Sequence, residues 1–239
     1  RPSLILVGSS MGAVLPPAAL PSGSYNLALS SFGAQTGLAI VARSRQRPQQ
    51  VLIEANVTAL LPPAEDLVAS LFEPVTFALQ RSLAVARHDH QPMALVDETL
   101  RRWSARGKKD SDYVLPPALL AKRVGELVAQ QAAWRATPTT AAALDHLAAQ
   151  VRALEEAGTR VIFFECPMDE RLLTSAQTEG VRALLRERFS PERYQWISLE
   201  DWASFHTSDG LHLIPESAER FARRLRDEIE RRSQRSTGM

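Results

Sequence analysis

The chain has 239 residues, of which 45% are apolar and 23% are charged, and its formal net charge is +1. This length is enough for one sizeable domain, and the near-neutral charge gives no electrostatic reason to expect a nucleic acid as partner. No run of 18 uncharged apolar residues occurs, which excludes a membrane-spanning helix. The single cysteine, Cys166, excludes an internal disulfide and a multi-cysteine metal site.

The first part of the chain alternates short apolar runs with segments of helical periodicity. Residues 4–7 (LILV) and 25–29 (YNLAL) are typical of strands, and 33–42 is expected to form a short apolar helix. A third strand is expected at 51–54. A helix is expected over 64–86, where apolar residues recur at every fourth position.

The second part of the chain continues this alternation. Helices are expected at 117–133 and 139–157, strands at 160–165 and 194–197, and a final helix at 215–232. Strands that alternate with helices predict an α/β domain whose parallel five-stranded sheet is covered on both faces.

A long segment without strands interrupts the pattern at 61–158, and its length exceeds that of a single crossover. We therefore expect one domain spanning 1–239, with a mainly helical insertion at about 61–158.

Polar residues follow several strands, at the edge where parallel sheets bind their ligands. The first strand leads into Gly8-Ser9-Ser10, and the run TSDGLHL after the last strand contains Asp209 and His212. A serine hydroxyl becomes a nucleophile when a base takes its proton and a third group orients that base. We therefore expect Ser10, His212 and Asp209 to form a catalytic triad. An ordinary Gly-Ser turn and a structural histidine are the alternatives.

Serine catalysis also needs hydrogen-bond donors that converge on the developing negative charge. The expected donors are the Ser10 backbone N–H, a backbone N–H in the turn from Ser31 to Gly33, and the side-chain amide of Asn56. Each of these residues follows one of the first three strands.

Two further features could carry chemistry, and a structural explanation is favoured for both. Cys166 ends an apolar strand-like run with no histidine near it in sequence, which favours a buried thiol over a nucleophile. His88 and His90 form an H-x-H pair, but no third and fourth ligands stand at an obvious spacing, which favours a solvated loop. We therefore expect neither a metal nor a cofactor.

Four of these segments together resemble the sequence blocks of the SGNH (GDSL-type) hydrolase superfamily. LILVGSS is similar to the first block, which places Ser10 at the nucleophile and Ser9 where the family more often has aspartate. YNLALSSFG resembles the second block. VLIEAN resembles a reduced third block with Asn56 as the oxyanion asparagine, and SDGLHL resembles the last block, with Asp209 and His212.

The chain departs from the family pattern in two blocks. An ungapped match puts Ser31 where the second block usually has glycine, and Gly33 follows two positions later. The third block lacks the usual G-x-N-D. The resemblance implies a flavodoxin-like three-layer α/β/α fold with strand order 2-1-3-4-5, in which the long helical insertion has no counterpart among the family's small esterases.

The resemblance also implies a function. Members with G-S-S and a Y-N-L second block look like extracytoplasmic proteins that add or remove O-acetyl groups on polysaccharides. We therefore expect a serine esterase or acyltransferase that acts on O-acetyl groups of a carbohydrate in the periplasm. The chain starts without Met, and strand-forming residues begin at Ser3. A removed signal peptide or membrane anchor would explain this start, as would an arbitrary boundary.

His206 and Trp202 lie shortly before Asp209 and are candidate substrate-binding residues. For Trp202, packing in the core is favoured over stacking on a sugar ring. The alternative functions are hydrolysis of lipids or small esters, and a non-catalytic protein that binds glycan or assembles with a membrane-bound acyltransferase. The reduced third block is the main support for a non-catalytic protein.

Overall fold

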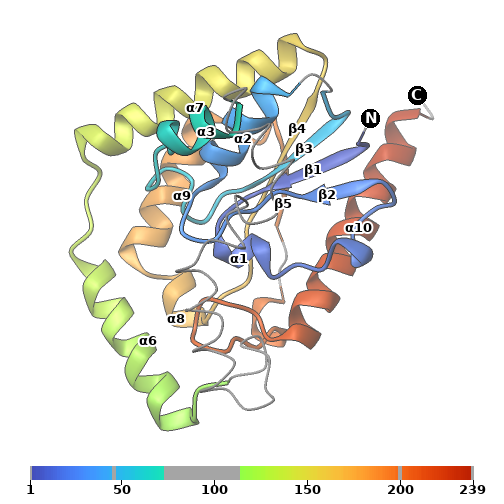
Figure 1. Cartoon of the computed structure of the whole chain (residues 1–239). Helices are drawn as coiled ribbons and strands as arrows, with labels where there is room; N and C mark the ends of the chain where they lie inside the picture. Colours follow the sequence, from blue (N-terminus) through green and yellow to red (C-terminus); the bar gives the residue numbers. More distant parts are fainter. Residues whose placement is uncertain (1, 45–46, 73–113, 199–200, 238–239) are drawn as a thin grey trace. The chain divides into compact units, whose positions relative to one another are not determined.

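The computed structural model describes residues 2–44, 47–72, 114–198 and 201–237 (Figure 1). Residues 1–63 and 114–239 form one compact unit, and residues 64–113 form a second. In the second unit, helix α3 (Glu65–Phe72) begins within the helix expected over 64–86. The rest of that expected helix, together with His88 and His90, lies outside the described residues.

A five-stranded parallel sheet forms the centre of the first unit, in the order β2-β1-β3-β4-β5. Its strands are β1 (Leu4–Val7), β2 (Ser24–Asn26), β3 (Gln50–Glu54), β4 (Arg160–Phe164) and β5 (Gln195–Ile197). Helices cover both faces of the sheet, which gives a three-layer flavodoxin-like arrangement (Figure 1). The predicted α/β class, parallel sheet and strand order are confirmed.

The second strand is shorter than the expected range of 25–29, although its pairing with β1 continues. The N–H of Leu27 donates to the Leu6 carbonyl at 2.8 Å, and the N–H of Leu29 donates to the Gly8 carbonyl at 3.0 Å. The backbone that leads toward the second predicted block is therefore held against the end of β1.

Around the sheet, the described residues of the first unit form helices and two short 3₁₀ turns. They are α1 (Ser10–Ala13), η1 (Pro17–Ala19), α2 (Ala34–Arg43), α6 (Pro117–Ala132), α7 (Pro138–Glu156), α8 (Glu170–Leu173), α9 (Ala176–Arg188), η5 (Trp202–Ser204) and α10 (Pro215–Thr237). The helices expected at 33–42, 117–133, 139–157 and 215–232 are confirmed as α2, α6, α7 and α10. The short α1 and the pair α8 and α9 have no counterpart among the expected helices. In the described part of the chain, no helix has both the length and the hydropathy to cross a membrane.

Side chains of the strands alternate between the two faces of the sheet, as their period of two requires. In β1, Leu4 and Leu6 join one hydrophobic cluster, whereas Ile5 and Val7 join another. Both faces are buried, which explains why the strands read as continuous apolar runs rather than as alternating patterns.

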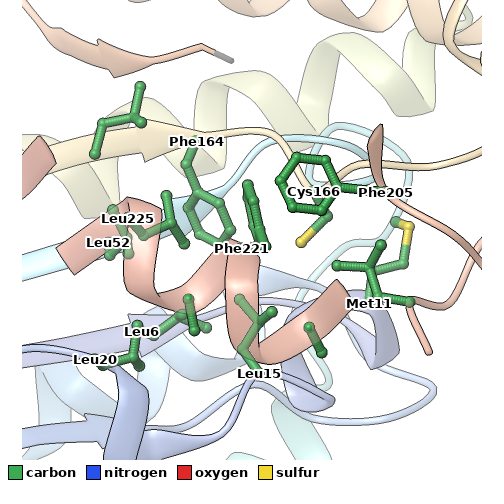
Figure 2. Packing of buried hydrophobic residues seen from close by; sticks show 14 of the residues in the cluster. Leu6, Met11, Leu15, Leu20, Leu52, Phe164, Cys166, Phe205, Phe221 and Leu225 are labelled. Atoms are coloured by element: carbon green, nitrogen blue, oxygen red, sulfur yellow. The ribbon is translucent and has the colours of Figure 1, made fainter. Parts of the chain in front are cut away.

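Helix α10 covers one face of the sheet. Figure 2 shows Phe221 and Leu225 of α10 beside Phe164 of β4, with Phe205 close by. The ring centroids of Phe164 and Phe221 are 6.2 Å apart, and those of Phe205 and Phe221 are 5.6 Å apart. Buried residues of α2, α7 and α9 pack in the cluster on the opposite face, together with Ile53 of β3.

Helix α7 is the crossover that leads into β4. The side chain of Thr137 caps its N-terminus, and its buried face, with Leu147 and Val151, packs in the same cluster as the strands. The segment of 61–158 expected as an insertion thus includes a helix that covers the sheet, and residues 64–113 form the separate unit.

Candidate active site

The predicted nucleophile, Ser10, lies where strand β1 ends. After Val7, the chain passes through Gly8 to Ser9, which is the N-cap of α1 and accepts a hydrogen bond from the Met11 N–H at 3.2 Å. Ser10 is the first residue of α1 and is half-buried. Its hydroxyl is therefore presented at the carboxyl edge of the sheet, where open parallel sheets bind ligands.

The predicted acid and base lie in a tight loop before α10. The Ser208 N–H donates to the His212 carbonyl at 2.8 Å, and the His212 N–H donates to Asp209 Oδ1 at 2.8 Å. Gly210 has a left-handed φ of 96°, and a Cβ there would lie 2.5 Å from Val124 Cγ2. The loop therefore requires glycine at this position.

Ser10, His212 and Asp209 form a continuous chain of hydrogen bonds. Ser10 Oγ lies 2.8 Å from His212 Nε2, and His212 Nδ1 lies 2.8 Å from Asp209 Oδ2. Because an ionised carboxylate only accepts hydrogen bonds, Nδ1 carries the ring proton and Nε2 accepts from the Ser10 hydroxyl. The structure thus brings together the three residues predicted as the triad, in the order that general-base activation of a serine needs.

The charges of Asp209 and His212 stabilise each other. Burial raises the pKa of Asp209, but hydrogen bonds from the ring and backbone of His212 and from the Leu211 N–H outweigh burial and hold that pKa at about 2. The hydrogen bond to Asp209 raises the pKa of His212 above its usual value against the effect of burial, and the charges of Asp209 and Glu54 raise it further. Asp209 is therefore ionised at neutral pH and stabilises a protonated His212.

Glu54, the last residue of β3, is a buried acid that our sequence reasoning missed. Its Oε2 accepts hydrogen bonds from the Ser9 N–H (2.8 Å) and the Gly12 N–H (3.0 Å), and Ser9 Oγ donates to Oε1 at 2.8 Å. Burial raises the pKa of Glu54, and the hydrogen bonds from Ser9 and Gly12 and the charge of His212 oppose that rise. The available signal was one acidic residue at the end of the apolar run VLIE, because a buried glutamate is rare unless it is paired.

Asn56, a predicted oxyanion donor, links the segments that follow β3 and β4. Its Nδ2 donates to the Cys166 carbonyl at 3.0 Å, and its Oδ1 accepts from the Cys166 N–H at 2.7 Å. The Cys166 thiol is buried, as expected, and burial raises its pKa well above the usual value. This link uses one of the two N–H groups of the Asn56 side-chain amide. The role of the other as an oxyanion donor stays a prediction.

The other predicted oxyanion donors are backbone groups at the ends of β1 and β2. Ser31 is exposed and has a left-handed φ of 69°, whereas Gly33 is buried and is the N-cap of α2. No described residue accepts a hydrogen bond from the N–H of Ser10 or Gly33. Their assignment to an oxyanion hole stays a prediction.

The two candidate substrate-binding residues have different surroundings. The His206 side chain is exposed, and its backbone N–H donates to Ser217 Oγ at 2.9 Å. Trp202 is half-buried against the cluster under α10 and also lines a cleft of about 460 Å³ together with polar residues such as Arg182 and Arg186. The packing expected for Trp202 is present, and the residue also contributes to the wall of this cleft.

Within the described residues, no group of three or more His, Cys, Asp or Glu side chains could hold a metal ion. A comparison with models of known protein families finds no match to this chain, and a search of curated proteins finds none either. The fold and the hydrogen bonds define an α/β protein with a Ser–His–Asp chain at the carboxyl edge of a parallel sheet. Such a chain can activate a serine for covalent attack on an acyl carbon.

Proposed function

We propose that this protein is a serine esterase or acyltransferase of the SGNH type. The observation that carries the proposal is the hydrogen-bonded chain from Ser10 Oγ through both ring nitrogens of His212 to Asp209 Oδ2. Each hydrogen bond is 2.8 Å long, within the range that proton transfer to a general base requires.

In the proposed reaction, Ser10 Oγ attacks the acyl carbon while His212 Nε2 takes the hydroxyl proton. The tetrahedral intermediate collapses as the ester C–O bond breaks, and His212 returns the proton to the leaving alcohol. A water or an acceptor hydroxyl then attacks the acyl-Ser10 ester, again with His212 as base, and restores the free serine. Asp209 holds the ring in place and stabilises its positive charge in both steps.

The proposed substrate is a carbohydrate that carries O-acetyl groups outside the cytoplasm. The resemblance of GSS and YNLALSSFG to blocks of polysaccharide-modifying members supports this substrate. A second support is a cleft whose lining includes Trp202, Arg182, Arg186 and Ser198; Ser198 directly follows β5, and the triad residues themselves do not line this cleft. A cleft that combines an aromatic residue with hydrogen-bonding side chains suits a sugar better than an acyl chain.

The decisive test is hydrolysis of p-nitrophenyl acetate by the wild type and by Ser10→Ala. We expect the wild type to release p-nitrophenol, and Ser10→Ala to lower kcat/KM by a factor of roughly 10³ or more. Ser22→Ala is the control, since Ser22 is exposed and lies on the turn before β2. Unchanged activity in Ser10→Ala would contradict the triad. A wild type inactive on every acetyl donor would favour the non-catalytic, glycan-binding alternative.

The substrate class has its own test. We expect acetate release from an acetylated polysaccharide, and faster turnover of p-nitrophenyl acetate than of p-nitrophenyl palmitate. A preference for the long acyl chain would favour a lipid esterase instead.

A further inference from the structure

One side chain fixes the backbone on both sides of the nucleophile. Glu54 Oε2 accepts the Ser9 N–H, one residue before Ser10, and the Gly12 N–H, two residues after it. The Ser9 hydroxyl donates to the same carboxylate, with Oγ 2.8 Å from Oε1 and 3.0 Å from Oε2. Glu54 itself is fully buried at the end of β3, so its position is set by the sheet.

We propose that Glu54 is a positioning residue for Ser10, whose ionised carboxylate anchors the Ser9–Gly12 turn and stabilises the positive charge that forms on His212. The inference rests on the proposed function, since it assigns a role within the same site. Glu54 acts through Ser9, Gly12 and the electric field at His212, and it does not touch the substrate.

The two glycines around the nucleophile show how closely the carboxylate is enclosed. A Cβ at Gly8 would lie 2.5 Å from Glu54 Oε2, and a Cβ at Gly12 would lie 2.9 Å from the same atom. Both distances are too short for real contacts with a Cβ, so any side chain at either position would displace the carboxylate. The close approach of the Glu54 carboxylate therefore explains why glycine occupies both ends of the segment GSSMG.

Burial raises the pKa of Glu54, whereas its hydrogen bonds and the charge of His212 act in the opposite direction and favour the ionised form. Three donors converge on the carboxylate, and a carboxylate that accepts several hydrogen bonds is stabilised as the anion. Among the described residues, Glu54 interacts electrostatically with His212 of the catalytic loop and with the Cys166 thiol, which lies in the segment after β4. Burial keeps Cys166 neutral, which leaves His212 as the partner of opposite charge, with Asp209 on its other ring nitrogen.

The variant Glu54→Gln removes the negative charge but can keep the hydrogen bonds that hold the Ser9–Gly12 turn. The glutamine side chain has nearly the same shape as glutamate. Its amide oxygen can accept hydrogen bonds from the N–H groups of Ser9 and Gly12, and its NH₂ can donate to Ser9 Oγ. Loss of the negative charge lowers the pKa of His212. We therefore expect the acid limb of the pH profile of kcat/KM for p-nitrophenyl acetate to move by up to about one unit to lower pH. We expect the plateau to fall by about tenfold, because the imidazolium is less stabilised.

Glu54→Ala removes the anchor as well as the charge. We expect kcat/KM to fall by roughly 100-fold, because the nucleophile is no longer held in its productive position.

Glu165→Gln is the matched control for loss of a buried carboxylate. Glu165 directly follows β4 as Glu54 ends β3, and it pairs with Arg182 at 2.7 Å rather than with the nucleophile turn. We expect Glu165→Gln to leave the midpoint of the acid limb unchanged.

An unchanged plateau and midpoint in Glu54→Gln would overturn the proposal, and so would an equal shift of the midpoint in Glu165→Gln. A second readout does not depend on turnover. The ring ¹⁵N signals of His212, assigned by their loss in His212→Asn, should titrate at lower pH in Glu54→Gln than in the wild type. If this shift occurs in a protein that is inactive on every ester, the electrostatic coupling of Glu54 to His212 is supported and the proposed function is contradicted. The absence of the shift in an active protein would overturn the role of Glu54 alone.

Discussion

The pairing of Asp209 with His212 sets the pH range in which Ser10 can be activated. Because the hydrogen bond to Asp209 raises the pKa of His212, the imidazole stays protonated to a higher pH than a free histidine. We therefore predict that activity falls on acidification, with a midpoint above the ordinary histidine pKa of about 6.5. Asp209→Asn should move this midpoint to lower pH and reduce kcat by roughly 10³- to 10⁴-fold.

The measurement is a pH profile of kcat/KM for p-nitrophenyl acetate. Asp227→Asn serves as the control, because Asp227 is an exposed carboxylate of α10 that pairs with its neighbour Arg226. A midpoint in Asp209→Asn equal to that of the wild type would show that Asp209 does not tune the base.

The proximity of Ser10 and His212 could be predicted although 202 positions separate them. Each is a polar residue placed at the carboxyl edge by the strand that precedes it, and parallel strands bring those edges together. The role of Glu54 could not be predicted in this way. Its partners Ser9 and Gly12 lie more than forty positions away, at the start of the helix that follows the neighbouring strand β1, and a sequence pattern does not show where buried donors converge.

At the scale of elements, the approach of α2 to β1 depends on a glycine. A Cβ at Gly37 would lie 2.8 Å from Val7 Cγ1 and 3.3 Å from the Leu27 carbonyl oxygen, so α2 would have to move away from the strand that leads to Ser10. We predict that Gly37→Ala lowers the free energy of unfolding by roughly 1–3 kcal/mol, as overpacking does elsewhere.

Gly125→Ala is the matched control for this prediction, measured in the same urea denaturation. Gly125 is an exposed residue of α6, and nothing lies within 4 Å of a Cβ built there. Alanine is the better helix former, so this variant should gain about 0.5–1 kcal/mol. Equal effects of the two substitutions would show that contact between α2 and β1 is not the cause.

The elements that could be predicted are those with a strong apolar pattern, and the ones missed lack it. Helix α9 is rich in polar residues, and one of its three buried residues, Thr178, is itself polar, so its apolar pattern is weak. Helix α1 has four residues, too few for any period, and its turn is held by contacts from elsewhere. Asn26 of β2 donates to the carbonyls of Gly12 and Leu15 at 3.0 and 2.9 Å, which no local pattern encodes.

At the scale of the sheet domain, the sheet lies between two hydrophobic clusters, and its strands contribute side chains to both. Phe163 and Phe164 are consecutive residues of β4, yet Phe163 belongs to the cluster under α2, α7 and α9, and Phe164 belongs to the cluster under α10. Substitutions on opposite faces therefore share no partner and should act independently.

This independence can be tested with one common substitution, Phe163→Leu, combined in turn with Phe189→Leu and with Phe221→Leu. The rings of Phe163 and Phe189 lie on the same face with centroids 4.9 Å apart, whereas Phe221 packs on the opposite face. We predict that the cross-sheet pair is additive in urea unfolding to within about 0.5 kcal/mol. The same-face pair should show a coupling of roughly 0.5–1.5 kcal/mol, because the first substitution already removes the aromatic contact that the second would lose. A coupling of that size between Phe163 and Phe221 would mean that the strands transmit packing changes across the sheet, and that the clusters act as one core.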